Sequence, residues 1–234
     1  MQNAGNRFGA MLVLVMATAL SAAFAAADYP TRPIRFVVPS TAGGAGDIFA
    51  RTIGQSLAEK FGKQVVVDNR PGANGIVGCE LVARSAPDGH TLLMANSAWF
   101  VINPNLYRKL SYDAIADFAP VTLGVVYGYV LVVHPSIAAN NVQELIALAK
   151  AKPGQLTFGS TGLGAVNHLA GEMFKTMTNT NLTHVPYKGS SAALADVLAG
   201  QASLMFDTPI TSAPQIRAGK LRALGITLAK RSSL

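Results

Sequence analysis

The chain has 234 residues, of which 50% are hydrophobic and 13% are charged, values typical of a soluble globular protein with one large domain or two small ones. The formal charge of +7 favours anionic partners. Lys and Arg are scattered, however, and no basic stripe alternates with aromatic residues, which argues against nucleic-acid binding. A single cysteine, Cys79, excludes an internal disulfide and a thiolate metal cluster, and its apolar neighbours predict a buried structural thiol.

The N-terminal segment predicts export to the periplasm. Arg7 is the only charged residue before Asp28, and residues 10–27 are all Ala, Leu, Met, Val, Thr, Ser or Phe. The small residues at the end of this segment predict a signal peptide that is cleaved after Ala27. A membrane anchor is the alternative, because about 17–18 apolar residues suffice to span a bilayer. The Ala-rich composition and the lack of a stop-transfer cluster favour cleavage.

Strand-like and helical segments alternate through the first half of the mature chain. Apolar, β-branched runs predict strands, and apolar residues at helical spacing predict helices that end at Gly or in turns. In chain order we expect a strand at 34–38, a helix at 49–61, a strand at 65–67, a helix at 75–84 and a strand at 91–95.

The second half repeats this alternation after a break between Tyr112 and Tyr129, which lacks a helical pattern and predicts a crossing between two domains. In chain order we expect strands at 130–133, 156–159, 183–185, 204–206 and 221–226, and helices at 141–149, 169–177 and 194–198. Alternating strands and helices predict an α/β fold with mostly parallel sheets that are covered on both faces.

Three loops stand where parallel sheets bind ligands, beyond the carboxyl ends of strands where helices begin. Residues 39–47, 160–168 and 186–191 combine glycines with small hydroxyl residues. Backbone N–H groups at helix starts attract carboxylate or phosphate, and hydroxyls add donors. Ordinary turn and capping chemistry is the alternative for each loop. The candidate ligand-binding residues are Ser40, Thr41, Gly43, Gly44, Asp47, Ser160, Thr161, Gly162, Gly164, His168, Tyr187, Gly189, Ser190 and Asp207.

For two of these candidates, Ser160 and Asp207, the sequence predicts a specific role. Ser160 is expected to donate to a ligand carboxylate, since it ends a strand and precedes Gly162 and Gly164; its alternative role is to cap the following helix. Asp207 also ends a strand, where it is expected either to hold an amine or hydroxyl of the ligand or to cap a helix.

Motifs for catalysis and metal binding are missing from the sequence. Residues 159–162 lack the G-x-S-x-G spacing of a nucleophile elbow, and no phosphate-binding G-x-x-x-x-G-K-[ST] loop occurs. The four histidines are not paired at i, i+3 or i+4, the spacing that metal sites on helices use. We therefore expect no catalytic residue, no metal and no cofactor, and the chain is not expected to be an enzyme.

Motifs along the whole mature chain match one family. They include Tyr29-Pro30, residues 67–73, residues 86–92, residues 103–107, residues 117–121, residues 184–189 and residues 218–224. Through these motifs the chain resembles the substrate-binding receptors of tripartite tricarboxylate transporters, the Bug family. The resemblance implies a type 2 periplasmic-binding-protein fold, with two α/β domains and a ligand cleft between them.

The resemblance also implies a function. Such a receptor is monomeric, uses no cofactor or metal, and binds a di- or tricarboxylate, an acidic amino acid or an aromatic acid for the membrane components of its transporter. The alternatives are an enzyme on the same general fold, such as a deaminase with a cofactor on a loop cysteine, and a nonfunctional fragment.

The expected domain limits follow from the crossing and the resemblance. Residues 1–27 form the signal peptide, 28–125 the first α/β domain, 126–222 the second, and 223–234 the start of a return crossing. Because family members continue beyond Leu234, the resemblance implies a chain that is truncated at its C-terminus and a first domain without its C-terminal completion.

Overall fold

The computed structural model describes residues 29–231. The expected signal peptide and its cleavage site lie outside the described residues. Within 29–231, no helix has both the length and the apolar character needed to cross a membrane.

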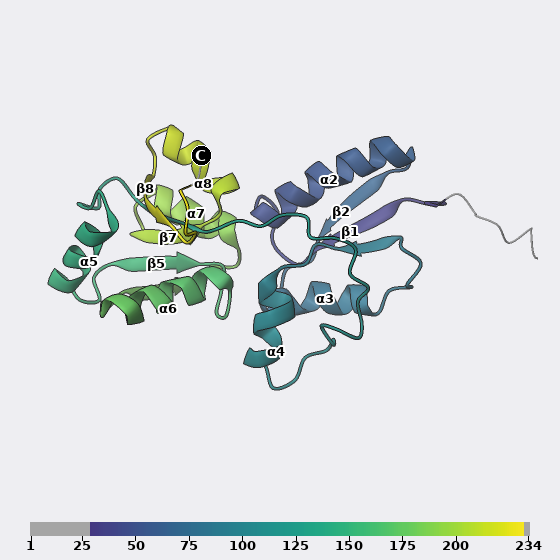
Figure 1. The fold of residues 1–234 in the computed structure, drawn as a ribbon, viewed down its shortest axis with the longest axis horizontal. Coiled ribbons are helices and arrows are strands. Elements are labelled where there is room, and N and C mark those ends of the chain that lie inside the picture. Colours follow the sequence, from purple (N-terminus) through teal and green to yellow (C-terminus); the bar gives the residue numbers. More distant parts are fainter. Residues whose placement is uncertain (1–28, 232–234) are drawn as a thin grey trace, which may run out of the picture.

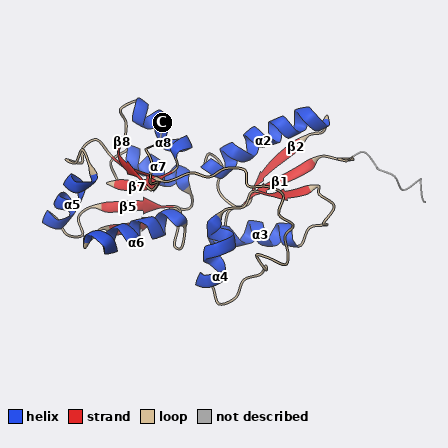
Figure 2. Cartoon of the chain, viewed as in Figure 1, coloured by secondary structure: helices blue, strands red, loops and turns tan. Residues whose placement is uncertain are grey.

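The described chain forms two α/β units that lie side by side (Figure 1). Their sheets are separate: a three-stranded sheet of order β2-β1-β3 and a five-stranded sheet of order β6-β5-β7-β4-β8. Helices pack against both sheets (Figure 2). This architecture agrees with the two α/β domains expected from the sequence.

The first unit contains β1 (Ile34–Val38), α2 (Ala45–Phe61), β2 (Val65–Asn69), a 3₁₀ turn (Ala73–Gly75), α3 (Ile76–Ala83), β3 (Thr91–Leu93), a π-helical turn (Ala98–Ile102) and α4 (Asn103–Leu106). Its sheet is parallel throughout, with β1 between β2 and β3. Burial of Val37 and Val38 fits a parallel strand that is covered on both faces. The Cys79 thiol on α3 is buried, as expected, and burial raises its pKa to about 12.

The second unit contains β4 (Val130–Val133), α5 (Val142–Ala151), β5 (Thr157–Ser160), α6 (Val166–Thr178), β6 (Thr183–Pro186), α7 (Ser190–Leu198), β7 (Leu204–Asp207), α8 (Pro209–Arg217) and β8 (Arg222–Ile226). Residues of α5 and α6 pack on one face of its sheet, around Phe158 and Leu204. Residues of α7 and α8 pack on the other face, around Val132 and Met205.

Strand β4 corrects the expectation of mostly parallel sheets. It is antiparallel to both of its neighbours, β7 and β8, whereas β5 is parallel to β6 and β7. The expectation is met fully only in the first unit. The physical reason is that β4 follows the crossing segment rather than a covering helix, so no βαβ connection fixes its direction.

The crossing between the units has the irregular structure expected of it. Residues 112–129 contain no helix or strand and run from one unit to the other (Figure 1). At the other end of the second unit, β8 pairs with β4 as far as Ile226, so the second sheet extends past the expected boundary at residue 222.

Candidate functional site

The first candidate loop, residues 39–47, connects β1 to α2 and is closed by Asp47. This buried carboxylate accepts a hydrogen bond from the Gly43 N–H at 2.9 Å and another from Arg51 at 3.1 Å. Burial alone would raise the pKa of Asp47, but these bonds outweigh it and the pKa is lowered. Asp47 therefore holds the loop in shape as an ionised group.

In the second loop, the Ser160 hydroxyl is bonded inside the protein. Its side chain is fully buried; its Oγ accepts the Gly162 N–H at 3.1 Å and lies 2.6 Å from Nε2 of His184. The N-cap of α6 is Ala165, so Ser160 does not cap that helix. Ser160 fixes the start of the second loop, and its hydroxyl is not an open donor in this arrangement.

Other residues of the second loop are held by the first turn of α6. The N–H and the hydroxyl of Thr161 both donate to Oδ1 of Asn167, at 3.2 and 3.1 Å. The Gly164 N–H donates to Nδ1 of His168 at 3.2 Å. Asn167 was not among the expected site residues, although an amide in the first turn of a helix is a recognisable partner for the preceding loop.

The third loop, residues 186–191, leads from β6 into α7. The Tyr187 hydroxyl donates to Asp196 on α7 at 2.8 Å, and burial together with this bond raises the pKa of Tyr187 to about 12. Gly189 is the N-cap residue of α7 and has φ +137°, a conformation that L side chains rarely adopt.

The first and third loops meet across the boundary between the units. The Ser191 hydroxyl donates to the Ala42 carbonyl at 2.9 Å. A β-carbon on Gly44 would lie 2.6 Å from Oγ of Ser190, and one on Gly189 would collide with Thr41. The absence of a side chain at Gly44 and Gly189 thus leaves room for the side chains of Ser190 and Thr41 from the opposite unit.

The second loop reaches the same boundary. A β-carbon on Gly164 would collide with Leu106 of α4 in the first unit, and one on Gly162 would lie 3.8 Å from the Tyr187 carbonyl of the third loop. All three loops that were singled out in the sequence therefore gather where the two units meet.

This boundary is rich in hydrogen-bond donors. Within residues 29–231, the hydroxyls of Ser40, Thr41 and Ser190 form no hydrogen bond with the protein. Three helices start here, α2, α6 and α7, and their N-cap residues provide no side-chain acceptor for the first-turn N–H groups. The positive ends of three helix dipoles and these free hydroxyls favour an anion.

Asp207 lies at the same edge of the second sheet, at the end of β7. It is 1% exposed and accepts a hydrogen bond from Thr211 at 2.7 Å. Burial raises the pKa of Asp207 to about 6, so the carboxyl holds its proton more tightly than an exposed aspartate. Burial raises the pKa values of Tyr127 and Tyr129 in the crossing segment, and the charge of the nearby Asp207 adds to this effect.

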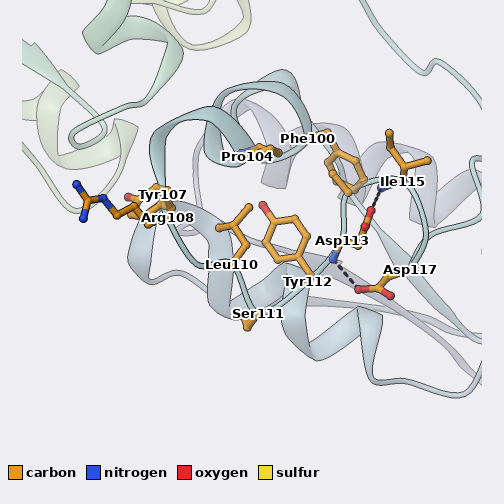
Figure 3. Close-up of a pocket in the computed structure, with 11 residues that line it drawn as sticks. Phe100, Pro104, Tyr107, Arg108, Leu110, Ser111, Tyr112, Asp113, Ile115 and Asp117 are labelled. Atoms are coloured by element: carbon orange, nitrogen blue, oxygen red, sulfur yellow. Dashed lines mark hydrogen bonds between the residues drawn. The ribbon is translucent and has the colours of Figure 1, made fainter.

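Two cavities are lined by other residues. One, of about 650 Å³, is in the first unit beside Tyr107 and Tyr112; Figure 3 shows Asp117 accepting the Asp113 N–H at its rim. The other, of about 430 Å³, lies between α8 and β8. None of the expected ligand-binding residues lines either cavity.

His184 is a second residue of this region, besides Asn167, that the sequence analysis missed. His184 on β6 contacts Ser160 and also His168, whose ring centroid is 4.3 Å away. The two histidines are far apart in the sequence, so spacing within one helix could not reveal the pair. A signal did exist, because His184 lies two residues before Pro186 in a strand that leads into the third loop.

Comparison with known proteins gives a consistent result. A family model described as the tripartite tricarboxylate transporter family receptor matches residues 49–234. Among curated proteins, the UPF0065 protein in the tcbD-tcbE intergenic region of Pseudomonas sp. (strain P51) is 40% identical over 222 residues, which are 95% of this chain and 66% of that protein. Protein BugT of Bordetella pertussis is 37% identical over 230 residues, which are 97% of this chain and 71% of that protein.

Solved structures match as well. R. palustris Rpa4515 with adipate is 39% identical, with a TM-score of 0.85 over 87% of this chain and 68% of that one. MatC from Rhodopseudomonas palustris with bound malate is 28% identical, with a TM-score of 0.80 over 87% and 69%. The chain thus spans about two thirds of the length of the proteins that it matches.

Proposed function

Because the chain belongs to the tripartite tricarboxylate transporter receptor family, with the periplasmic-binding-protein fold, we propose that it binds a small carboxylate in the periplasm and passes it to the membrane components of such a transporter. The proposed site is the boundary between the two units, where the three loops meet. No catalytic step is proposed: the Cys79 thiol and the Ser160 hydroxyl are both buried.

The observation that carries this proposal is the gathering of donors at the boundary. Free hydroxyls of Thr41 and Ser190 come from opposite units, and the starts of α2, α6 and α7 add backbone N–H groups. Donors outnumber ionised acceptors there, since the Asp47 carboxylate is already bonded to Gly43 and Arg51. A carboxylate that bridges the two units satisfies donors from both.

Related proteins indicate which carboxylates to test. One structure of a relative contains adipate and another contains malate. We propose the same ligand class, a dicarboxylate, for this chain. Both acids carry a carboxylate at each end, so one end can occupy the loops.

Titration calorimetry of the purified chain with adipate and with dimethyl adipate tests the proposal. The free acid should bind and the diester should not, because esterification removes the charge that the donors recognise. A thermal melt without ligand first confirms cooperative unfolding, which a nonfunctional fragment would lack. Equal binding of acid and diester would contradict the proposal.

The same titration with Thr41→Val identifies the donors. This substitution keeps the shape of the side chain and removes a hydroxyl that has no partner in the protein. A hydrogen bond to a charged group is worth about 1.5–3 kcal/mol, so adipate should bind at least about tenfold more weakly. Thr52→Val is the matched control, because the Thr52 hydroxyl donates to the Ile48 carbonyl within α2; its affinity should not change.

A further inference from the structure

His184 and His168 form a pair of imidazoles beside the second loop. Their ring centroids are 4.3 Å apart, with the planes tilted by 41°. Phe158 of β5 stacks on His184 with a centroid distance of 4.8 Å. The pair thus lies between the sheet and α6, and His184 contacts the Ser160 hydroxyl at the end of β5.

The Ser160 hydroxyl has one proton and two acceptors within reach. Nε2 of His184 lies at 2.6 Å and the Gly162 carbonyl at 3.2 Å, while Oγ itself accepts the Gly162 N–H. When Nε2 carries a proton, it donates to Oγ, and the hydroxyl proton turns to the Gly162 carbonyl. Nε2 carries a proton in the imidazolium and in one neutral tautomer, and only the imidazolium also places a positive charge beside the second loop.

The surroundings of His184 disfavour its charged form. Burial lowers the pKa of His184, and repulsion from His168 lowers it further; Glu172 acts in the opposite direction and Lys175 in the same direction. These charged neighbours are all on α6, and Glu172 and Lys175 pair with each other at 2.9 Å. The neighbours that β5 contributes, Phe158 and Ser160, carry no charge.

A bound anion would change this balance. The second loop starts at Ser160, so a carboxylate at the loops would lie near the imidazole pair and provide its missing counter-charge. We propose that the site takes up its carboxylate together with one proton, which His184 holds beside the second loop. This inference rests on the proposed carboxylate function and adds the proton as a second ligand.

Linkage makes the effect reciprocal: if a carboxylate favours protonation of the pair, then protonation of the pair favours the carboxylate. Adipate affinity should therefore rise as the pH is lowered from 8 to 6, by at most about tenfold per pH unit, the limit for one linked proton. Protonation of adipate itself acts in the opposite direction, because it removes the charge that the loops recognise. Tightening at low pH cannot come from the ligand.

The test is calorimetry with adipate at pH 6 in two buffers that differ in ionisation enthalpy, which counts the protons taken up on binding. The unmodified chain should take up a measurable fraction of one proton. His184→Gln keeps a polar partner for Ser160 but cannot be charged, so it should take up fewer protons with adipate than the unmodified chain and gain less affinity between pH 8 and 6. The same comparison in an Asp207→Asn background removes the contribution of the Asp207 carboxyl, whose pKa is about 6.

His134→Gln is the matched control. His134 follows β4 at the opposite edge of the sheet, where its ring contacts Ser136, and this variant should retain the proton uptake. Adipate binding by the unmodified chain without proton uptake, at an affinity that does not change from pH 8 to pH 6, would overturn this inference alone. If neither adipate nor malate binds at any of these pH values, the proposed function fails and the inference fails with it.

Discussion

At the scale of single residues, the polar groups expected to bind ligand divide into two kinds. Asp47, Ser160 and Tyr187 are already bonded within the protein, whereas the hydroxyls of Thr41 and Ser190 have no protein partner in the described part of the chain. Groups of the first kind shape the loops, because a buried polar atom without a partner costs free energy. Groups of the second kind remain available to a ligand. The Thr41 hydroxyl is therefore a better candidate donor to the ligand than the Ser160 hydroxyl expected from the sequence.

Asp207 gives a prediction at the same scale. Its pKa of about 6 lies above the ordinary value of 3.8, so the unfolded chain releases this proton before the folded chain does. The contribution of Asp207 to stability is therefore present below about pH 4, and it is lost as the pH rises through about 6. Asp207→Asn, which stays neutral, should gain stability relative to the unmodified chain between pH 4 and pH 7, by up to about 3 kcal/mol.

Thermal melts of both proteins across this pH range measure the effect. Asp113→Asn is the control of opposite sign, because hydrogen bonds from the backbone N–H groups of Ala116 and Ile115 lower the pKa of Asp113. A difference between Asp207→Asn and the unmodified chain that stays constant from pH 4 to pH 7 would show that the folded carboxyl titrates normally.

At the scale of elements, α6 is placed by its close approach to β5. Gly171 of α6 faces the ring of Phe158, where a β-carbon would collide with the ring. Phe158 is fully buried and also stacks on His184, so it has little room to move. The absence of a side chain at Gly171 thus fixes the distance between the helix and the strand that together hold the imidazole pair.

Gly171→Ala should destabilise the fold although alanine is the better helix former. Overpacking costs about 1–3 kcal/mol, more than the gain of about 0.5–1 kcal/mol from helix propensity. Gly46→Ala on α2 is the matched control, since its β-carbon would have no neighbour closer than 3.6 Å. Urea unfolding distinguishes the two variants, and equal stability of both would mean that α6 can shift away from β5 at little cost.

At the scale of the whole molecule, the two units touch through the first and third loops. The bond from Ser191 to the Ala42 carbonyl and the packing of Thr41 on Gly189 cross the boundary. One crossing segment, residues 112–129, leads from the first unit into the second (Figure 1). We predict that a ligand that binds between the units enters only when these loop contacts open.

A disulfide between the first and third loops tests whether their contact must open for the ligand to enter. A β-carbon on Gly44 would lie 4.0 Å from Cβ of Ser190, within the range of about 3.5–4.5 Å that disulfides need. Gly44→Cys combined with Ser190→Cys should form a disulfide spontaneously in air, while Cys79 stays inert because burial raises its pKa to about 12. Thiol titration of the folded protein measures bond formation.

Adipate binding by this double variant should be blocked when it is oxidised, because the locked loops exclude the ligand. A reductant should restore binding that is weaker than that of the unmodified chain, because the Ser190 hydroxyl is lost. The reduced double variant is its own control for the two substitutions. If the oxidised form binds adipate as tightly as the reduced double variant, then the loop contact does not need to open and the ligand enters elsewhere.

The sequence by itself determined the local structure and the family. Alternating apolar runs predicted the strands and helices, and glycines with small hydroxyl residues marked the three loops, because these signals depend on neighbours within a few residues. The break at 112–129 predicted the crossing. The motifs from Tyr29 to Leu224 identified the family that the comparisons then showed.

Only the tertiary structure decided which groups meet. The hydrogen bond from Ser191 to Ala42 joins residues 149 positions apart, and the pair of His168 and His184 depends on how α6 packs on the sheet. The direction of β4 likewise follows from the path of the crossing segment. Such contacts form between segments whose separation in sequence carries no periodic signal, so only the packing of buried surfaces determines them.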